Sequence, residues 1–369
     1  MFLDQGGSWC ECSGSATRQQ RERLAERNLA RSLDELRTQN VWITQFAEDV
    51  GRQDLPVGLM MIIDKICAEV LNPDTSHLVH VTDQRTYSNT RLKNDAGRGL
   101  ILELPAAAHR SVFWAPVIAH EAAHDRFTDE AGTFETASVD LAARMAEIQN
   151  EFPPVDSADK RHREEVLPLW VEELFCDAVA ARLMGPSALF ALAGQLVGDP
   201  WTLQSAHPPT PVRIKRTIEV LGSTGWLAVL EERNPTVLNW LRTVADLRPV
   251  NGPVTIDFLT AACEAFDDTI ETMATNVVQT PFTAEASLPV VDECVEHFAL
   301  GLWPVEVARS NYTEWEFLLA TWLLGLHGEQ DEPGNIARVP ADDLSNGALL
   351  KTIELSRVAH LWGEHDPAQ

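Results

Sequence analysis

The chain has 369 residues, of which 45% are hydrophobic, so it can bury a sizeable core and form two domains, or one domain with a large accessory part. Its formal net charge of −26 repels nucleic-acid phosphates and anionic lipid, which disfavours nucleic acid and a membrane surface as partners. The six cysteines lack the dense spacing of a disulfide scaffold and favour a reducing compartment. We therefore expect a cytoplasmic protein.

The N-terminal part of the chain divides into two predicted segments. Residues 1–16 are polar and rich in Gly and Ser, without the basic and apolar runs of a signal peptide, and we expect them to be disordered. Residues 17–53 carry Leu29, Leu33 and Leu36 at helical spacing, which predicts an N-terminal helical segment.

The next part of the chain, residues 54–221, combines strand and helix patterns. Between residues 77 and 105 the segments HLVHVTD and LILELP are bounded by turn residues and predict strands of a small sheet. Helical patterns occupy the remainder, at about 57–71, 109–126, 135–150, 160–184, 187–197 and 212–221. This mixture predicts an α+β, mostly α-helical fold.

Residues 222–369 form a series of amphipathic segments punctuated by Gly and Pro, and they predict an α-helical accessory domain. This domain is the candidate surface for a protein partner, although its tryptophans are more typical of a core than of a binding platform. Its longest late apolar stretch, 317–326, is too short for a bilayer, which a helix of about 20 apolar residues spans.

The segment FWAPVIAHEAAHDRF carries the most informative motif, HExxH. On a helix, His120 and His124 stand one turn apart on the same face, where two imidazole nitrogens can share a zinc ion. Glu121 lies beside them, placed to take a proton from metal-activated water. The competing interpretation is a pair of surface histidines, but Phe113 and Ile118 indicate a buried helix.

A catalytic zinc site takes three protein ligands, so a third must follow in the chain. The metzincin pattern HExxHxxGxxH fails, because Phe127 replaces its Gly and Glu130 its third His. The segment GTFETAS resembles the aspzincin loop that supplies a third ligand, but Glu135 replaces its Asp. From the sequence, this aspzincin-like loop stays an open alternative for the third ligand.

The segment WVEELFCDAVAARLMGP offers a better third ligand. Glu173 and Asp177 share one face of an otherwise apolar helix, so one carboxylate can bind the metal while the other orients a ligating imidazole. Glu172 is expected to be the exposed neighbour, and a one-residue error would exchange the two glutamates. An ordinary acidic stripe facing solvent is the remaining alternative.

A third segment, SAHPPTPVRIKR, places His207 before two prolines that stiffen its loop. A histidine fixed near the metal could stabilise the oxyanion of a tetrahedral intermediate. A helix-capping or loop histidine is an equally good interpretation of the same residue.

In this order, HExxH, ExxxD and His-Pro-Pro followed by an Arg resemble gluzincin peptidases of the CAAX-processing and heat-shock HtpX type over about residues 100–220. The resemblance implies a zincin-like domain and a role for six residues. They are the zinc ligands His120, His124 and Glu173, the general base Glu121, the orienting aspartate Asp177 and the transition-state ligand His207. Those enzymes are mostly membrane-embedded, whereas this sequence has no spanning segment, so their substrates are not carried over.

Two functions follow as hypotheses. The first is a zinc peptidase that acts on a soluble protein or peptide, with Glu121 as general base and with LILELP as a sheet edge that binds the substrate as an added strand. The second is a regulatory or interaction protein in which zinc only stabilises the fold and the helical second half binds a partner.

Overall fold

The computed structural model describes residues 55–82, 87–94, 97–105, 111–135, 139–195, 207–247, 254–302, 312–327 and 347–356. These residues are mostly helical and include one small sheet, which confirms the predicted α+β class. The chain divides into two units, Met1–Asp54 and Leu55–Gln369, and every described residue belongs to the second of them. The predictions for residues 1–16 and 17–53 lie outside the described part of the chain.

The predicted helices of the first half are present. They are α2 (Val57–Val70), α3 (Ala115–Glu135) after the short 3-10 helix η1 (Val112–Trp114), α4 (Val139–Glu151), α5 (Ser157–Met184), α6 (Pro186–Gln195) and α7 (Thr210–Ser223). Helix α3 continues well beyond the predicted end at residue 126. The residues GTFE at its C-terminal end are therefore helical, which disfavours the aspzincin-like loop.

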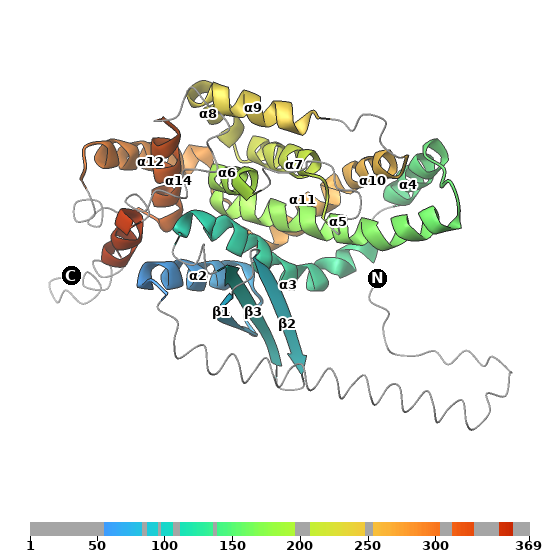
Figure 1. Ribbon diagram of the computed structural model, residues 1–369, viewed down its shortest axis with the longest axis horizontal. Helices are drawn as coiled ribbons and strands as arrows, with labels where there is room; N and C mark the ends of the chain where they lie inside the picture. The colour runs from blue at the N-terminus through green and yellow to red at the C-terminus, as the bar shows by residue number, and fades with distance from the viewer. Residues whose placement is uncertain are drawn as a thin grey trace. The chain divides into compact units, whose positions relative to one another are not determined.

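The sheet contains three described strands in the order β1-β3-β2 (Figure 1). The central strand β3 (Gly97–Pro105) is parallel to β1 (Thr75–Thr82) and antiparallel to β2 (Ser88–Asn94). The predicted segments HLVHVTD and LILELP lie in β1 and β3, but the prediction that LILELP is a sheet edge is wrong. Strand β2 covers that edge, and its sequence SNTRLKN is too polar to show the apolar alternation by which a strand is predicted.

One face of the sheet packs against α3. Leu100, Leu102 and Leu104 alternate along β3 and are almost fully buried. The strand register pairs Leu102 with Asn89 and Leu100 with Arg91, so these two polar side chains of β2 lie on the same face. An edge strand thereby presents polar groups directly to the helix of the HExxH motif.

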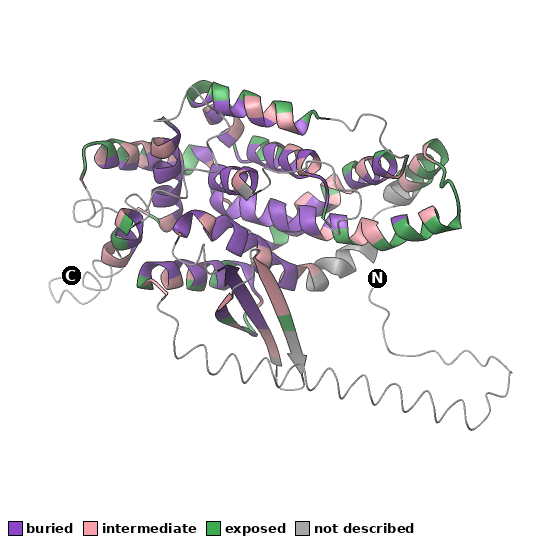
Figure 2. Cartoon of the chain, in the orientation of Figure 1, coloured by how far each residue is buried: buried purple, intermediate pink, exposed green. Residues whose placement is uncertain are grey.

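Helix α5 lies at the centre of the helical part and contacts several other helices, among them α3, α7, α10 (Val254–Ala265) and α11 (Asp267–Val277). Figure 2 shows that its first half is largely exposed and its second half buried. Nearly every side chain from Trp170 to Met184 is buried, and three of them are the charged residues Glu173, Asp177 and Arg182. Because buried charges are costly unless paired, these residues require partners nearby.

The remaining described helices are α8 (Trp226–Arg233), α9 (Pro235–Ala245), α12 (Ala284–Ala299), α14 (Glu314–His327) and residues 347–356. Buried residues of both halves belong to one hydrophobic cluster, and α11 packs directly on α5. The division into a catalytic and an accessory domain at residue 222 stays a prediction. Within the described residues, no helix is both long and apolar enough to cross a membrane.

Candidate metal centre

Helix α3 holds the two histidines of the HExxH motif against the core. Val112 and Phe113, just before the helix, are fully buried and anchor its N-terminal end. His120 and His124 follow on the buried face, with 7% and 9% of their surface exposed and ring centroids 5.1 Å apart. The interpretation of this motif as two surface histidines is therefore wrong.

The Glu173 carboxylate of α5 lies opposite both rings. Its Oε2 atom is 3.3 Å from His120 Nε2, and its Oε1 atom is 3.6 Å from His124 Nε2. Although Oε2 is buried, it accepts no hydrogen bond of good geometry. A buried carboxylate oxygen without a hydrogen bond, facing two imidazole nitrogens, fits the donor set of a divalent metal such as zinc.

Both imidazole rings are held by a carboxylate at their other nitrogen. Asp177 Oδ1 lies 2.9 Å from His120 Nδ1, and Glu172 Oε1 lies 2.9 Å from His124 Nδ1. Such contacts fix the tautomer that leaves Nε2 free to bind a metal, and ligating histidines nearly always make them.

The prediction that Glu172 is exposed is wrong. Its side chain is only 14% exposed, because the rings of α3 cover this edge of α5. Its carboxylate meets the Nδ1 atom of His124, whereas Glu173 meets the Nε2 atoms of both rings. The structure thus gives the two glutamates different contacts, and of the two only Glu173 faces the Nε2 atoms.

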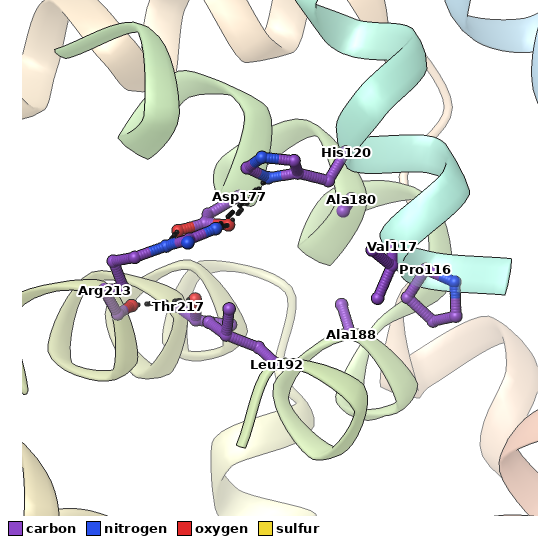
Figure 3. A pocket seen from close by; sticks show the side chains of 9 residues that line it. All are labelled: Pro116, Val117, His120, Asp177, Ala180, Ala188, Leu192, Arg213 and Thr217. Atoms are coloured by element: carbon purple, nitrogen blue, oxygen red, sulfur yellow. Dashed lines mark hydrogen bonds and ion pairs between the residues drawn. The ribbon is translucent and has the colours of Figure 1, made fainter. Parts of the chain in front are cut away.

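Arg213 of α7 joins the two buried acids of α5, and sequence reasoning assigned it no role. Its Nε and Nη2 atoms each donate to Asp177 over 2.7 Å (Figure 3). The Nη2 atom also lies 3.6 Å from Glu173 Oε2. Burial alone would raise the pKa of Asp177, but the charge and hydrogen bonds of Arg213 lower it below its usual range. Asp177 therefore stays ionised and can accept a hydrogen bond from the Nδ1–H group of His120.

Glu173 is also kept ionised. Burial would raise its pKa, but the nearby imidazole nitrogens of His120 and His207 and the charge on Arg213 lower it. His207 Nδ1 lies 3.0 Å from Glu173 Oε2, and 60% of the His207 side chain is exposed. The stiff loop before α7 thus brings His207 to the open side of the site.

Glu121 lies beside the rings and is half-buried. Its Oε2 atom accepts a 2.8 Å hydrogen bond from Asn89 Nδ2 of strand β2. This contact leaves the other carboxylate oxygen of Glu121 available for a proton. Asn89 was not predicted as a site residue, and only its position in a polar strand before the motif could have drawn attention to it.

Cys176 is a further side chain of a type that can bind a metal. Its sulfur and one ring nitrogen each of His120 and His124 lie within 4.8 Å of one another. Burial, followed by the charges of nearby acids, raises the pKa of its thiol well above the ordinary value, so the sulfur is protonated unless a metal displaces the proton.

A cavity of about 20 Å³ lies against the contacts between His120, Asp177 and Arg213 (Figure 3). This volume is about that of one water molecule. Its other walls are mostly small or apolar and come from α3, α5, α6 and α7. They are Pro116, Val117, Ala180, Ala188, Leu192 and Thr217.

The charge around the two rings favours a cation. Four carboxylates lie close to them, and the cationic side chains in contact with these acids include Arg91, Arg213 and, when protonated, His207. The three motifs that resemble gluzincin peptidases thus meet in one place. Comparisons of the chain with protein families, curated proteins and solved structures found no match.

Proposed function

We propose that this protein is a zinc-dependent peptidase whose zincin-like catalytic domain spans residues 54–221. The observation that carries this proposal is the Glu173 carboxylate, which faces the Nε2 atoms of His120 and His124 from a second helix. Three such donors hold zinc and leave room for water or substrate, the arrangement typical of catalytic sites. When bound, zinc supplies Lewis acidity that makes water nucleophilic near neutral pH.

The side chains around the ligands supply the remaining parts of a hydrolytic site. Glu121 takes a proton from the attacking water and returns it to the leaving amine. Its hydrogen bond with Asn89 fixes the carboxylate for this transfer. His207, at the exposed side of the site, donates to the oxyanion that develops on the substrate carbonyl.

The substrate edge is β2, because β3 is the central described strand and, of the two outer strands, β2 contacts Glu121 and the His124 carbonyl. An extended peptide can add to the outer side of β2 through main-chain hydrogen bonds. Asn89 and Arg91 fix this strand to the site, since Asn89 contacts Glu121 and Arg91 Nη1 donates to the His124 carbonyl over 3.0 Å. A soluble protein or peptide is thus the proposed substrate.

The second candidate is a regulatory protein in which zinc stabilises the fold without catalysis. The buried Cys176 sulfur favours it, because cysteine and histidine are the usual donors of structural zinc sites. In this case the helical second half binds a protein partner. Removal of the metal would then lower thermal stability strongly, and no peptide would be hydrolysed.

Metal analysis combined with a peptide-library assay tests the proposal. Wild type prepared without chelators should contain about one zinc per chain, and Glu173→Ala should lose it. Glu121→Gln should keep the metal and lose hydrolysis. Glu165→Ala removes an exposed carboxylate from the same helix and should change neither result.

A wild-type protein without metal would reject the peptidase. An active Glu121→Gln variant would remove Glu121 from its role as base. Metal-loaded wild type that hydrolyses no peptide and loses its fold on chelation would favour the regulatory protein.

A further inference from the structure

We propose that Glu172 and Arg91 are positioning residues that connect the edge strand β2 to the metal ligand His124. Through them, the affinity of the metal site depends on β2. The inference rests on the metal centre of the proposed function and identifies how the centre is controlled.

The first step is the contact between Glu172 and His124. Glu172 Oε1 accepts from His124 Nδ1 over 2.9 Å, and the two side chains are only 14% and 11% exposed. In this setting, which is largely shielded from water, the hydrogen bond fixes the ring orientation and increases the basicity of Nε2. Without it, the ring can rotate and Nε2 no longer has a defined direction towards Glu173.

The second step is Arg91, which extends from β2 to the same pair. Its Nη1 atom donates to the main-chain oxygen of His124 over 3.0 Å, and its Nη2 atom lies 3.4 Å from Glu172 Oε1. One guanidinium group thus contacts both the backbone of the ligand and the carboxylate that orients it. The planar, always charged guanidinium is suited to this double contact.

The charges explain why Glu172 needs such a partner. Glu172 and Glu173 are adjacent in the sequence, and both carboxylates point into the region of the two rings. Arg213 is paired with Asp177 and lies 3.6 Å from Glu173. Arg91 lies 3.4 Å from Glu172, so a guanidinium group is near each of the two glutamates. Arg213 comes from α7 in the core, whereas Arg91 comes from an edge strand.

This difference makes β2 the adjustable part of the site. Arg91 is 35% exposed, whereas only 9% of the Arg213 side chain is exposed. A peptide added to the outer edge of β2 restricts the movement of this strand and, through Arg91, the movement of Glu172 and His124. Substrate binding would therefore tighten the metal site.

Zinc affinity measured by competition with a chromophoric chelator tests these residues without any substrate. Glu172→Ala should bind zinc about 10- to 100-fold more weakly, the usual effect of removing a partner of a ligating histidine. Glu172→Gln should lose less, because its amide oxygen still accepts from Nδ1–H. Arg91→Ala should lose about two- to fivefold, the range of a partly exposed ion pair, and less when Glu172 is already Ala.

Two further measurements separate positioning from a structural role. The metal-free Glu172→Ala protein should still unfold in one cooperative transition, at a temperature lowered only by the lost contact with His124. Its Co²⁺ form should show an altered visible spectrum because the ligand geometry changes. Glu165→Ala, with the same change of charge on the exposed part of α5, should match wild type in every measurement.

The outcomes are distinguishable. Wild type that binds no zinc or Co²⁺ would reject the proposed metal centre itself. Wild type that binds tightly, with unchanged affinity in Glu172→Ala, would overturn the positioning role alone. If Arg91→Ala lowers zinc affinity equally in the presence and absence of the Glu172 carboxylate, Arg91 does not act through Glu172 and has no positioning role.

Discussion

The buried pair of Arg213 and Asp177 allows a quantitative prediction. Arg213→Met keeps most of the side-chain volume but removes the guanidinium group, which donates twice to Asp177 over 2.7 Å at a site where both side chains are almost fully buried. Removal of one member of a buried ion pair leaves an uncompensated charge and costs about 3–5 kcal/mol. Total stabilities are about 5–15 kcal/mol, so this variant should lose a large share of its free energy of unfolding.

Urea denaturation of the metal-free protein measures this loss, and the chain contains a matched control. Arg233 makes a similar two-pronged ion pair with Asp292, but both side chains are 37% exposed. Arg233→Met should therefore cost less than about 1 kcal/mol. Equal losses for the two variants, or a loss below about 1 kcal/mol for Arg213→Met, would refute the reasoning from burial.

Three further predictions concern other parts of the chain. Burial raises the pKa of Asp267 to about 6 from 3.8, so the folded state binds more protons and stability should fall as the pH rises from about 4 to 6. Asp267→Asn should not show this fall, and above pH 7 its free energy of unfolding in urea should exceed that of wild type by about 1–2 kcal/mol, after allowance for partial exposure. A pH dependence of stability equal to that of wild type would contradict this. Gly58→Ala should lower the free energy of unfolding by about 1–3 kcal/mol, because the added Cβ would lie 2.6 Å from the Leu350 carbonyl oxygen. Thermal or urea unfolding measures this loss, and an unchanged stability would argue against this close helix contact. Asn89→Ala should lower kcat about tenfold or more without loss of zinc, since Glu121 loses a hydrogen bond to its charged group, and a change in KM alone would contradict that role.

Local patterns allowed much of the fold to be predicted. Helical periodicity indicated α2 to α7 because apolar side chains recur on one face of these helices, and β1 and β3 carry apolar alternation. Strand β2 could not be predicted, since its polar side chains contact α3 rather than a hydrophobic core. Its absence from the prediction led directly to the wrong choice of sheet edge.

The candidate site divides in the same way. The sequence by itself determined that His120 and His124 share a helix face, and that Glu173 and Asp177 share another, because these pairs lie four residues apart on regular helices. Only the tertiary structure decided which glutamate faces the Nε2 atoms and which holds Nδ1 of His124. It also brought Arg213, Arg91 and Asn89 to the acids. These contacts depend on how separate elements pack, and the spacing of residues within one element contains no information about its neighbours.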